Sequence, residues 1–203
     1  MKLFYKPGAC SLASHIVLRE VGATFELEKV DTDTGLTEHG LEYGKVNPKG
    51  YVPALKLDSG EILTEGASIL QYIARQNPDS GLSPATGTIP HARHQEYLNY
   101  VASELHKAFG PFFSNTATEN DKKKAKVNVA KNFDYVNDLL SDSRSYLLGD
   151  DFSVADSYMF VVSNWSNFVG IDLKKWSNVA AYVERIAKRP AAQAAMKAEG
   201  LIS

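Results

Sequence analysis

The chain has 203 residues, of which 44% are apolar, and its 22 basic and 24 acidic side chains give a formal charge of −2. This length can bury one large core or two modest ones, and the near-neutral charge offers no basic surplus for nucleic acid or an anionic membrane. No apolar run approaches the roughly 20 residues of a membrane span, and no charged-then-apolar leader precedes the first strand pattern. We therefore expect a soluble, cytoplasmic protein.

The first two dozen residues predict a strand, a tight turn and a helix. Residues 3–5 are apolar and aromatic, and a Pro-Gly pair ends this run. Apolar residues then recur at helical spacing over residues 12–21. Cys10, the one cysteine of the chain, is therefore predicted at the N-terminus of a helix.

This position allows two interpretations of Cys10. Backbone N–H groups and the positive end of the helix dipole favour an anion, and they can lower the pKa of a thiol from its free value of about 8.5. A lone cysteine, however, is more often a small buried apolar residue. The strand–turn–helix position favours the reactive thiol. A single cysteine forms no internal disulfide, which agrees with a reducing compartment.

The rest of the N-terminal part alternates strands and helices. Residues 25–30 alternate apolar and polar side chains, as a half-buried strand does, and residues 31–44 are polar with at most a short irregular helix. Residues 51–57 and 61–63 flank a short turn and predict a hairpin, and a helix with an apolar face at residues 69–74 comes next. The predicted order is βαβ and then ββα.

The composition then changes. Residues 78–90 are rich in proline and glycine, and they predict a linker between a domain of residues 1–77 and a domain of residues 91–203. Everything beyond the linker has helical periodicity. Residues 154–169 are apolar nearly all round, which predicts a buried central helix, and residues 153–156 have the spacing of a capping box at its start. We expect an α/β domain and then an all-helical bundle.

Two loop positions are candidates for ligand binding. Pro53 opens a strand, and a cis bond between Val52 and Pro53 would leave the Val52 backbone groups free to pair with an extended, peptide-like ligand, although trans is the usual form. Glu65 and Gly66 stand at a predicted helix start. Glu65 either complements the helix dipole or accepts from a ligand ammonium, and the Gly66 N–H can bind a ligand carboxylate.

A polar constellation lies on the first long helix beyond the linker. Asn99, Ser103 and His106 recur at i, i+4 and i+7, so they share one face of a regular helix, apart from its apolar stripe. Lys107 adjoins them. A polar helix face is usually only solvent-exposed, so this spacing alone is a weak signal of a site.

Together these features resemble a cytosolic glutathione S-transferase of the bacterial beta class. The segments that carry the resemblance extend over essentially the whole chain: MKLFYKPGACSLASHI, VNPKGYVPAL, LTEGASILQYIA, LNYVASELHK and FSVADSYMF. The resemblance implies an N-terminal thioredoxin-like domain, a C-terminal helical bundle and a homodimer. It also implies glutathione as co-substrate and a small electrophile as substrate, with no metal, no nucleic acid and no membrane partner.

The resemblance further implies a set of site residues. Cys10 and His106 would be catalytic, and Cys10 would lie next to the glutathione sulfur, with which it can form a mixed disulfide. Val52 would pair with the cysteinyl part of glutathione, and Glu65 would hold the γ-glutamyl end. The full glutathione-binding set would be Cys10, Tyr51, Val52, Pro53, Glu65, Gly66, Asn99, Ser103, His106 and Lys107.

One position departs from the family pattern. The beta class often has a lysine near position 35 to meet the glycine carboxylate of glutathione, whereas this chain has Gly35. The capture of that carboxylate therefore stays open.

The expected activity is conjugation of the glutathione thiol to electrophiles, with thiol–disulfide exchange through Cys10. Two alternatives remain open at the level of sequence. Either the main role is that of a glutathione-dependent thiol transferase or peroxidase, or the fold serves as a binding module that turns over no substrate.

Overall fold

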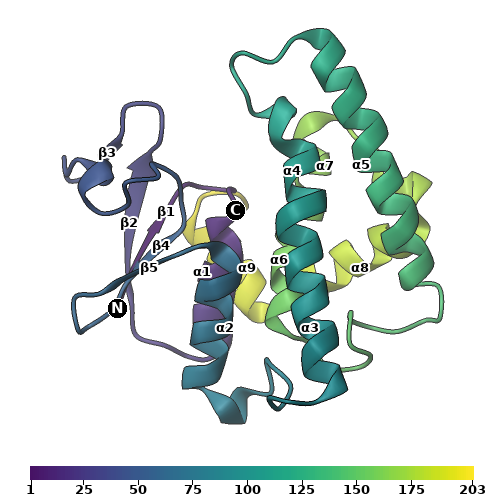
Figure 1. Cartoon of the computed structure of the whole chain (residues 1–203), viewed down its shortest axis with the longest axis horizontal. Helices are drawn as coiled ribbons and strands as arrows, with labels where there is room; N and C mark the ends of the chain where they lie inside the picture. Colours follow the sequence, from purple (N-terminus) through teal and green to yellow (C-terminus); the bar gives the residue numbers. More distant parts are fainter. The chain divides into compact units, whose positions relative to one another are not determined.

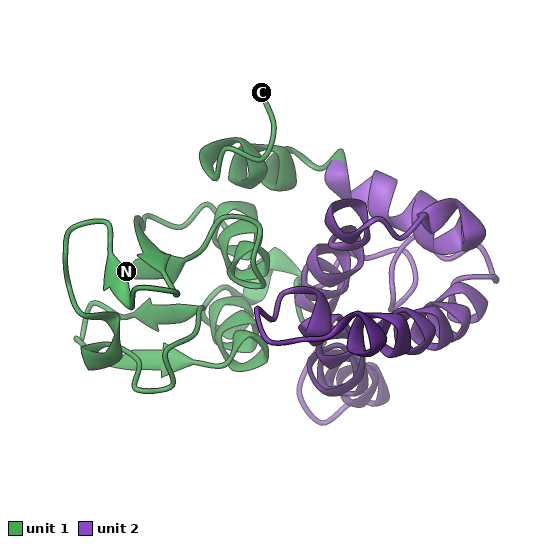
Figure 2. Ribbon diagram, turned by 90° about the horizontal axis from the view of Figure 1, so that it is seen from above, with its two compact units in different colours: residues 1–83, 188–203 green, residues 84–187 purple.

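The computed structural model describes residues 1–203, and their contacts divide them into two units. Unit 1 comprises Met1–Ser83 and Lys188–Ser203, and unit 2 comprises Pro84–Ala187 (Figure 2). Strands β1 to β5 all belong to unit 1, whereas unit 2 is helical. The expected fold class is therefore confirmed, with an α/β part and a helical part.

Unit 1 is built on a five-stranded sheet in the order β3-β2-β1-β4-β5. Its strands are β1 (Lys2–Tyr5), β2 (Glu26–Asp31), β3 (Leu36–Thr37), β4 (Ala54–Lys56) and β5 (Ile62–Thr64). β1 pairs in parallel with β2 and antiparallel with β4, and β4 pairs antiparallel with β5, so the predicted βαβ unit and hairpin are both present. The sequence did not indicate β3, because two residues are too few to show an alternating pattern.

Helices α1 (Ser11–Glu20) and α2 (Gly66–Gln76) pack against the sheet and against each other. A separate buried cluster, with the short helix η1 (Tyr43–Lys45) beside it, contains Phe4, Val30, Tyr43, Val52 and Ala54. Since side chains alternate along a strand, neighbouring residues of β1 and β4 supply opposite faces of the sheet. The side chain of Val52 is therefore anchored in the core just before β4 begins. A further short helix, η2 (Pro78–Ser80), lies after α2.

The C-terminal helix α9 (Pro190–Ala198) packs against α1 and belongs to unit 1 (Figure 1). The limits expected from the sequence placed all of residues 91–203 in the helical domain. Long-range polar pairs hold the C-terminal segment in unit 1 instead: Arg189 Nε lies 2.7 Å from Glu20 Oε1. Such pairs leave no mark on local periodicity, which is why the sequence pattern did not indicate them.

Unit 2 is a bundle in which α6 is the buried centre. Its helices are α3 (Ile89–Tyr100), η3 (Val101–Leu105), α4 (His106–Phe109), η4 (Gly110–Phe112), α5 (Glu119–Leu139), α6 (Val154–Asn164), α7 (Ser166–Val169), η5 (Leu173–Lys175) and α8 (Ser177–Ala187). α6 contacts both α3 and α8 and is buried from its first residue to its last but one, as its apolar sequence predicts (Figure 1). None of the helices combines the length and the apolar character that crossing a membrane requires.

The capping box predicted at the start of α6 is confirmed, and it is buried. Asp156 Oδ2 accepts hydrogen bonds from the backbone N–H and the Oγ of Ser153 at 2.8 and 2.7 Å. Asp156 Oδ1 accepts from the Leu147 N–H at 2.7 Å and from the Tyr182 hydroxyl at 2.8 Å. One carboxylate therefore satisfies four donors and ties α6 to α8 and to the preceding loop.

Removing this carboxylate should destabilise the protein far more than removing its counterpart on α5. We expect Asp156→Ala to lower the free energy of unfolding by about 3 kcal/mol or more, because several buried donors lose their partner together. Asp121→Ala is the matched control: Asp121 has the same place in the capping box of α5 but lies at the surface, so its loss should cost only about 1 kcal/mol. Urea unfolding monitored by circular dichroism measures both variants. Equal losses would contradict the role assigned to burial.

Candidate functional site

Cys10 lies where the sequence predicts it, as the N-cap residue of α1. Its Sγ is 3.3 Å from the carbonyl oxygen of Val52, to which the thiol donates. Although the residue is partly exposed, the surroundings of the sulfur desolvate it, and this burial raises the pKa of the Cys10 thiol to about 12. The backbone N–H groups of Cys10 and Ser11 lower the pKa only in part. The direction is opposite to the expected one: desolvation outweighs the helix N-terminus, and Cys10 is a neutral thiol at neutral pH.

A chain of hydrogen bonds through the buried residues Glu199 and His15 holds the turn that precedes Cys10. Gly8, which has a φ of +72°, donates its N–H to Glu199 Oε2 at 2.9 Å. Glu199 Oε1 lies 2.9 Å from His15 Nδ1, and His15 Nε2 accepts from Arg19 Nε at 2.9 Å. Because arginine has only donors, Nδ1 of His15 carries the ring proton and donates to Glu199. Sequence reasoning missed Glu199, since 184 residues separate it from His15.

Val52 presents its backbone beside the thiol. The peptide bond between Val52 and Pro53 is cis, the form that sequence reasoning associated with ligand pairing and not the usual trans form. The preceding carbonyl, that of Tyr51, accepts from Asn47 Nδ2 at 2.7 Å and from the Tyr43 hydroxyl at 3.1 Å, so this segment is held from within the unit. The Val52 carbonyl accepts a hydrogen bond from the Cys10 thiol, and no group of the protein pairs with the Val52 N–H.

Glu65 is held in an unusual backbone conformation at the start of α2. Its backbone φ is +69°, a positive value that residues other than glycine rarely adopt. Strained backbone conformations of this kind are frequent at binding sites. The Glu65 carboxylate accepts from the Tyr51 hydroxyl at 2.9 Å and forms an ion pair with Lys49. The hydrogen bond to Glu65 raises the pKa of Lys49. A Cβ added to Gly66 would meet only Pro53 Cγ, at 3.9 Å, so the protein's own packing does not require glycine there.

Unit 1 therefore brings together all of its predicted site residues. They are Cys10, Tyr51, Val52, Pro53, Glu65 and Gly66. The thiol, an unpaired backbone N–H and a carboxylate lie in succession from the start of α1 to the start of α2. Such a row of groups can hold an extended peptide.

The helix that carries the remaining predicted residues is not a continuous α-helix. Val101–Leu105 forms a π-helical turn, in which the His106 N–H bonds to the carbonyl five residues earlier. A π turn contains one extra residue and so rotates the residues after it by roughly 100° about the helix axis. Asn99, Ser103 and Lys107 are exposed, whereas His106 is turned partly into the unit. A common face for Asn99, Ser103 and His106 stays a prediction, because the π turn changes the regular spacing on which it rests.

His106 is enclosed by aromatic rings of unit 2. Its Nδ1 lies 2.8 Å from the Tyr158 hydroxyl. The imidazole also packs edge-to-face against the Trp165 ring, with the ring centres 4.8 Å apart. Burial, with a smaller contribution from the charge of Lys107, lowers the pKa of His106 to about 4. The ring is therefore neutral at neutral pH. Sequence reasoning did not single out Tyr158, because an aromatic residue in a mostly apolar helix is typical of a core position.

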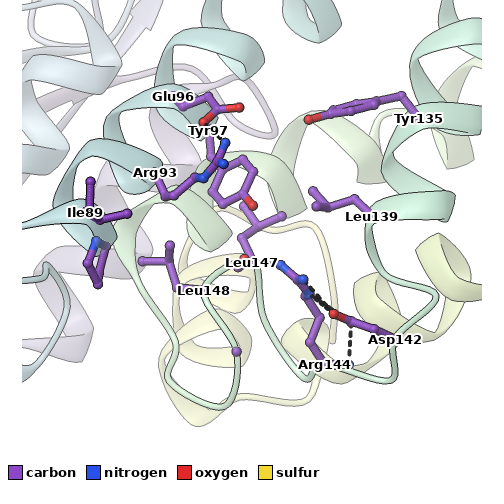
Figure 3. Close-up of a pocket in the computed structure, with 12 residues that line it drawn as sticks. Ile89, Arg93, Glu96, Tyr97, Tyr135, Leu139, Asp142, Arg144, Leu147 and Leu148 are labelled. Atoms are coloured by element: carbon purple, nitrogen blue, oxygen red, sulfur yellow. Dashed lines mark hydrogen bonds and ion pairs between the residues drawn. The ribbon is translucent and has the colours of Figure 1, made fainter.

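A cavity of about 530 Å³ opens in unit 2 among α3, α5 and the loop after α5 (Figure 3). Its charged side chains neutralise one another, because Arg93 pairs with Glu96 and Arg144 pairs with Asp142. None of the predicted site residues lines it. We assign this cavity no role in catalysis.

Glu28, Glu38 and His39 of unit 1 offer ligand atoms within 4.8 Å of one another, which is close enough to share a metal ion. The protein itself provides partners for both carboxylates. Glu28 lies 2.9 Å from His39 Nδ1 and 3.3 Å from Lys2 Nζ, and Glu38 accepts the Lys29 N–H at 2.6 Å. We assign no metal here, and the absence of a metal cofactor stays a prediction.

Comparison with known proteins adds an independent line of evidence. Family models match residues 8–76, as a glutathione S-transferase N-terminal domain, and residues 100–190, as a glutathione S-transferase C-terminal domain. Glutathione S-transferase GstA of Escherichia coli O157:H7 is 46% identical, and the alignment covers 99% of this chain and 100% of that protein.

Two solved structures are also similar over the full chain. A bacterial beta class glutathione S-transferase from Sphingomonas chungbukensis is 48% identical, with a TM-score of 0.96 and coverage of 100% of both chains. A sphingomonad glutathione S-transferase complexed with glutathione is likewise 48% identical, with a TM-score of 0.95 and the same coverage.

The raised pKa of Cys10 predicts its reactivity. Iodoacetamide reacts with thiolates, and the mass of the intact protein reports the modification because the chain has a single cysteine. Since the pKa is raised to about 12, we expect the rate to increase about tenfold per pH unit up to pH 10 without levelling. Free glutathione, measured alongside, should level near its own thiol pKa. A plateau at or below pH 7 for the protein would show that Cys10 is a thiolate after all.

Proposed function

The chain belongs to the glutathione S-transferase family and is a glutathione transferase, and we propose that unit 1 holds the tripeptide along the Val52 backbone. The observation that carries this proposal is the row formed by the Cys10 thiol, the Val52 backbone and the Glu65 carboxylate. Those groups match the three parts of an extended peptide that ends in a free ammonium group.

In the proposed complex, Val52 pairs with the cysteinyl residue of glutathione. The unpaired Val52 N–H donates to the cysteinyl carbonyl. The cysteinyl N–H replaces the Cys10 thiol as the hydrogen-bond donor to the Val52 carbonyl. Because Cys10 Sγ lies 3.3 Å from that carbonyl, this pairing sets the glutathione sulfur next to Cys10. The anchored Val52 side chain keeps the backbone groups in place.

Glu65 and Gly66 receive the γ-glutamyl end in this proposal. The Glu65 carboxylate accepts from the ligand ammonium, and the Gly66 N–H, at the N-terminus of the 11-residue helix α2, donates to the ligand carboxylate. Lys49 pairs with Glu65, so the ligand ammonium shares this carboxylate with Lys49 or displaces it.

The proposal extends to Asn99, Ser103, His106 and Lys107 as further contacts of the same ligand. This extension rests on the family resemblance. The resemblance also supports a homodimer, a small electrophile as second substrate and a cytoplasmic location, which we propose on the same ground.

The raised thiol pKa favours conjugation over exchange as the main activity. With its pKa raised to about 12, the Cys10 thiol is almost entirely un-ionised at pH 7, so it is a poor nucleophile but keeps a proton that it can donate. The nucleophile is then the thiolate of glutathione itself. With an aryl halide, this sulfur forms a bond to the ring carbon, the halide leaves with its bonding electrons, and the thiol proton passes to water.

Cys10→Ala should therefore affect two activities unequally. Exchange with a small disulfide should fall at least a hundredfold if it passes through Cys10, since the variant has no cysteine. Conjugation to an aryl halide should fall only about fivefold, which corresponds to one lost hydrogen bond of about 1 kcal/mol. Steady-state rates with both substrates measure the difference. An equal loss of the two activities would contradict this division of roles.

Glu65→Gln should weaken glutathione binding about tenfold or more, because the variant replaces a charge-assisted hydrogen bond to the ligand ammonium with a neutral one. Titration calorimetry measures the dissociation constant. Glu61→Gln is the matched control, since Glu61 is an exposed glutamate in the hairpin before β5 and belongs to no predicted site. Unchanged binding in Glu65→Gln, or an equal loss in Glu61→Gln, would remove Glu65 from the site.

A further inference from the structure

A hydroxyl from the buried helix α6 meets the imidazole of His106. Tyr158 is 5% exposed, and its hydroxyl oxygen lies 2.8 Å from His106 Nδ1. The two rings are perpendicular, with their centres 6.0 Å apart. The predicted site residues do not include Tyr158, so only the fold reveals this contact.

The backbone turns His106 toward this hydroxyl. The π-helical turn at Val101–Leu105 ends at His106, where the backbone N–H of His106 bonds to the Val101 carbonyl, and the imidazole is partly buried. Trp165 meets the same ring at a centre-to-centre distance of 4.8 Å and an angle of 75°. The imidazole is thus held by a hydrogen bond on one side and an aromatic ring on another.

The hydrogen bond also selects the position of the ring proton. A neutral imidazole has one N–H donor and one acceptor nitrogen, and which is which depends on the partner of each. The acceptor nitrogen is a much stronger base than a phenol oxygen, and a phenol has a proton to donate. The pairing in which each group acts in its stronger role has the Tyr158 hydroxyl donating to Nδ1, and this pairing places the single ring proton on Nε2.

We propose that Tyr158 is a positioning residue that holds His106 as the Nε2–H tautomer, so that His106 offers a ligand a hydrogen-bond donor and not a base. The consequence for catalysis rests on the proposed function. His106 then stabilises the thiolate of glutathione through Nε2–H, while the thiol proton is lost to water and not to the imidazole.

Nitrogen NMR on protein with ¹⁵N-labelled histidine tests the tautomer directly. The chain has five histidines, and the His106→Gln variant identifies the His106 signals by their loss. We expect wild-type His106 to show a protonated Nε2 and an unprotonated Nδ1 at neutral pH. Tyr158→Phe, which keeps the ring and removes only the hydroxyl, should shift His106 to a mixture of both tautomers.

A matched control separates this effect from general loosening of unit 2. Tyr100→Phe removes another hydroxyl of the same unit, one that donates to Asn132 Oδ1 at 2.7 Å, and it should leave the His106 signals unchanged. A thermal unfolding curve for each variant verifies that it is folded. A protonated Nδ1 in the wild type, or an unchanged tautomer in folded Tyr158→Phe, would overturn the proposal.

Kinetic measurements separate the positioning role of Tyr158 from the catalytic role proposed for His106. If both hold, Tyr158→Phe lowers kcat for aryl halide conjugation about fivefold with little change in KM for glutathione, and it has no further effect in the His106→Gln background. If the tautomer shifts in Tyr158→Phe while kcat stays unchanged, the positioning by Tyr158 stands and the catalytic role proposed for His106 falls.

Discussion

The hydrogen bond between the Cys10 thiol and the Val52 carbonyl connects the two loops on which the unit 1 site depends. One loop comes after β1 and the other precedes β4, and these strands pair antiparallel, so the end of one lies beside the beginning of the other. The core behind Val52 and the hydrogen bond from Gly8 to Glu199 then determine where both loops can lie. Sheet pairing, and not a feature of either loop alone, places a sulfur beside a peptide backbone.

Desolvation sets the chemistry of the principal titratable groups in both units. It raises the pKa of Cys10 and lowers that of His106, so each is neutral at neutral pH. Neutral groups with a proton to give are suited to stabilising an anion that a ligand brings. The same effect explains why a pattern-based argument from the helix dipole had the wrong sign for Cys10: the dipole is a property of the local chain, whereas burial is a property of the whole fold.

Local patterns predicted the features that local interactions determine. The strand–turn–helix around Cys10, the hairpin after Val52 and the capping box at Asp156 depend on residues within a few positions of one another, and the structure contains all three. The assignment of α9 to unit 1 and the hydroxyl beside His106 depend on residues far apart in the chain, so no periodicity reveals them. The π turn is a third case, because its wider hydrogen-bonding pattern leaves the spacing of side chains in the sequence unchanged while altering where they point.

The attachment of Glu199 to Gly8 and His15 has a consequence for biosynthesis. Glu199, which fastens the turn before Cys10, is synthesised 191 residues after Gly8 of that turn. During translation, His15 and the Gly8 N–H therefore lack the Glu199 carboxylate until the segment of residues 188–203 has been synthesised. The surroundings of the thiol are therefore complete only once Glu199 has been synthesised and has folded back onto the N-terminal turn.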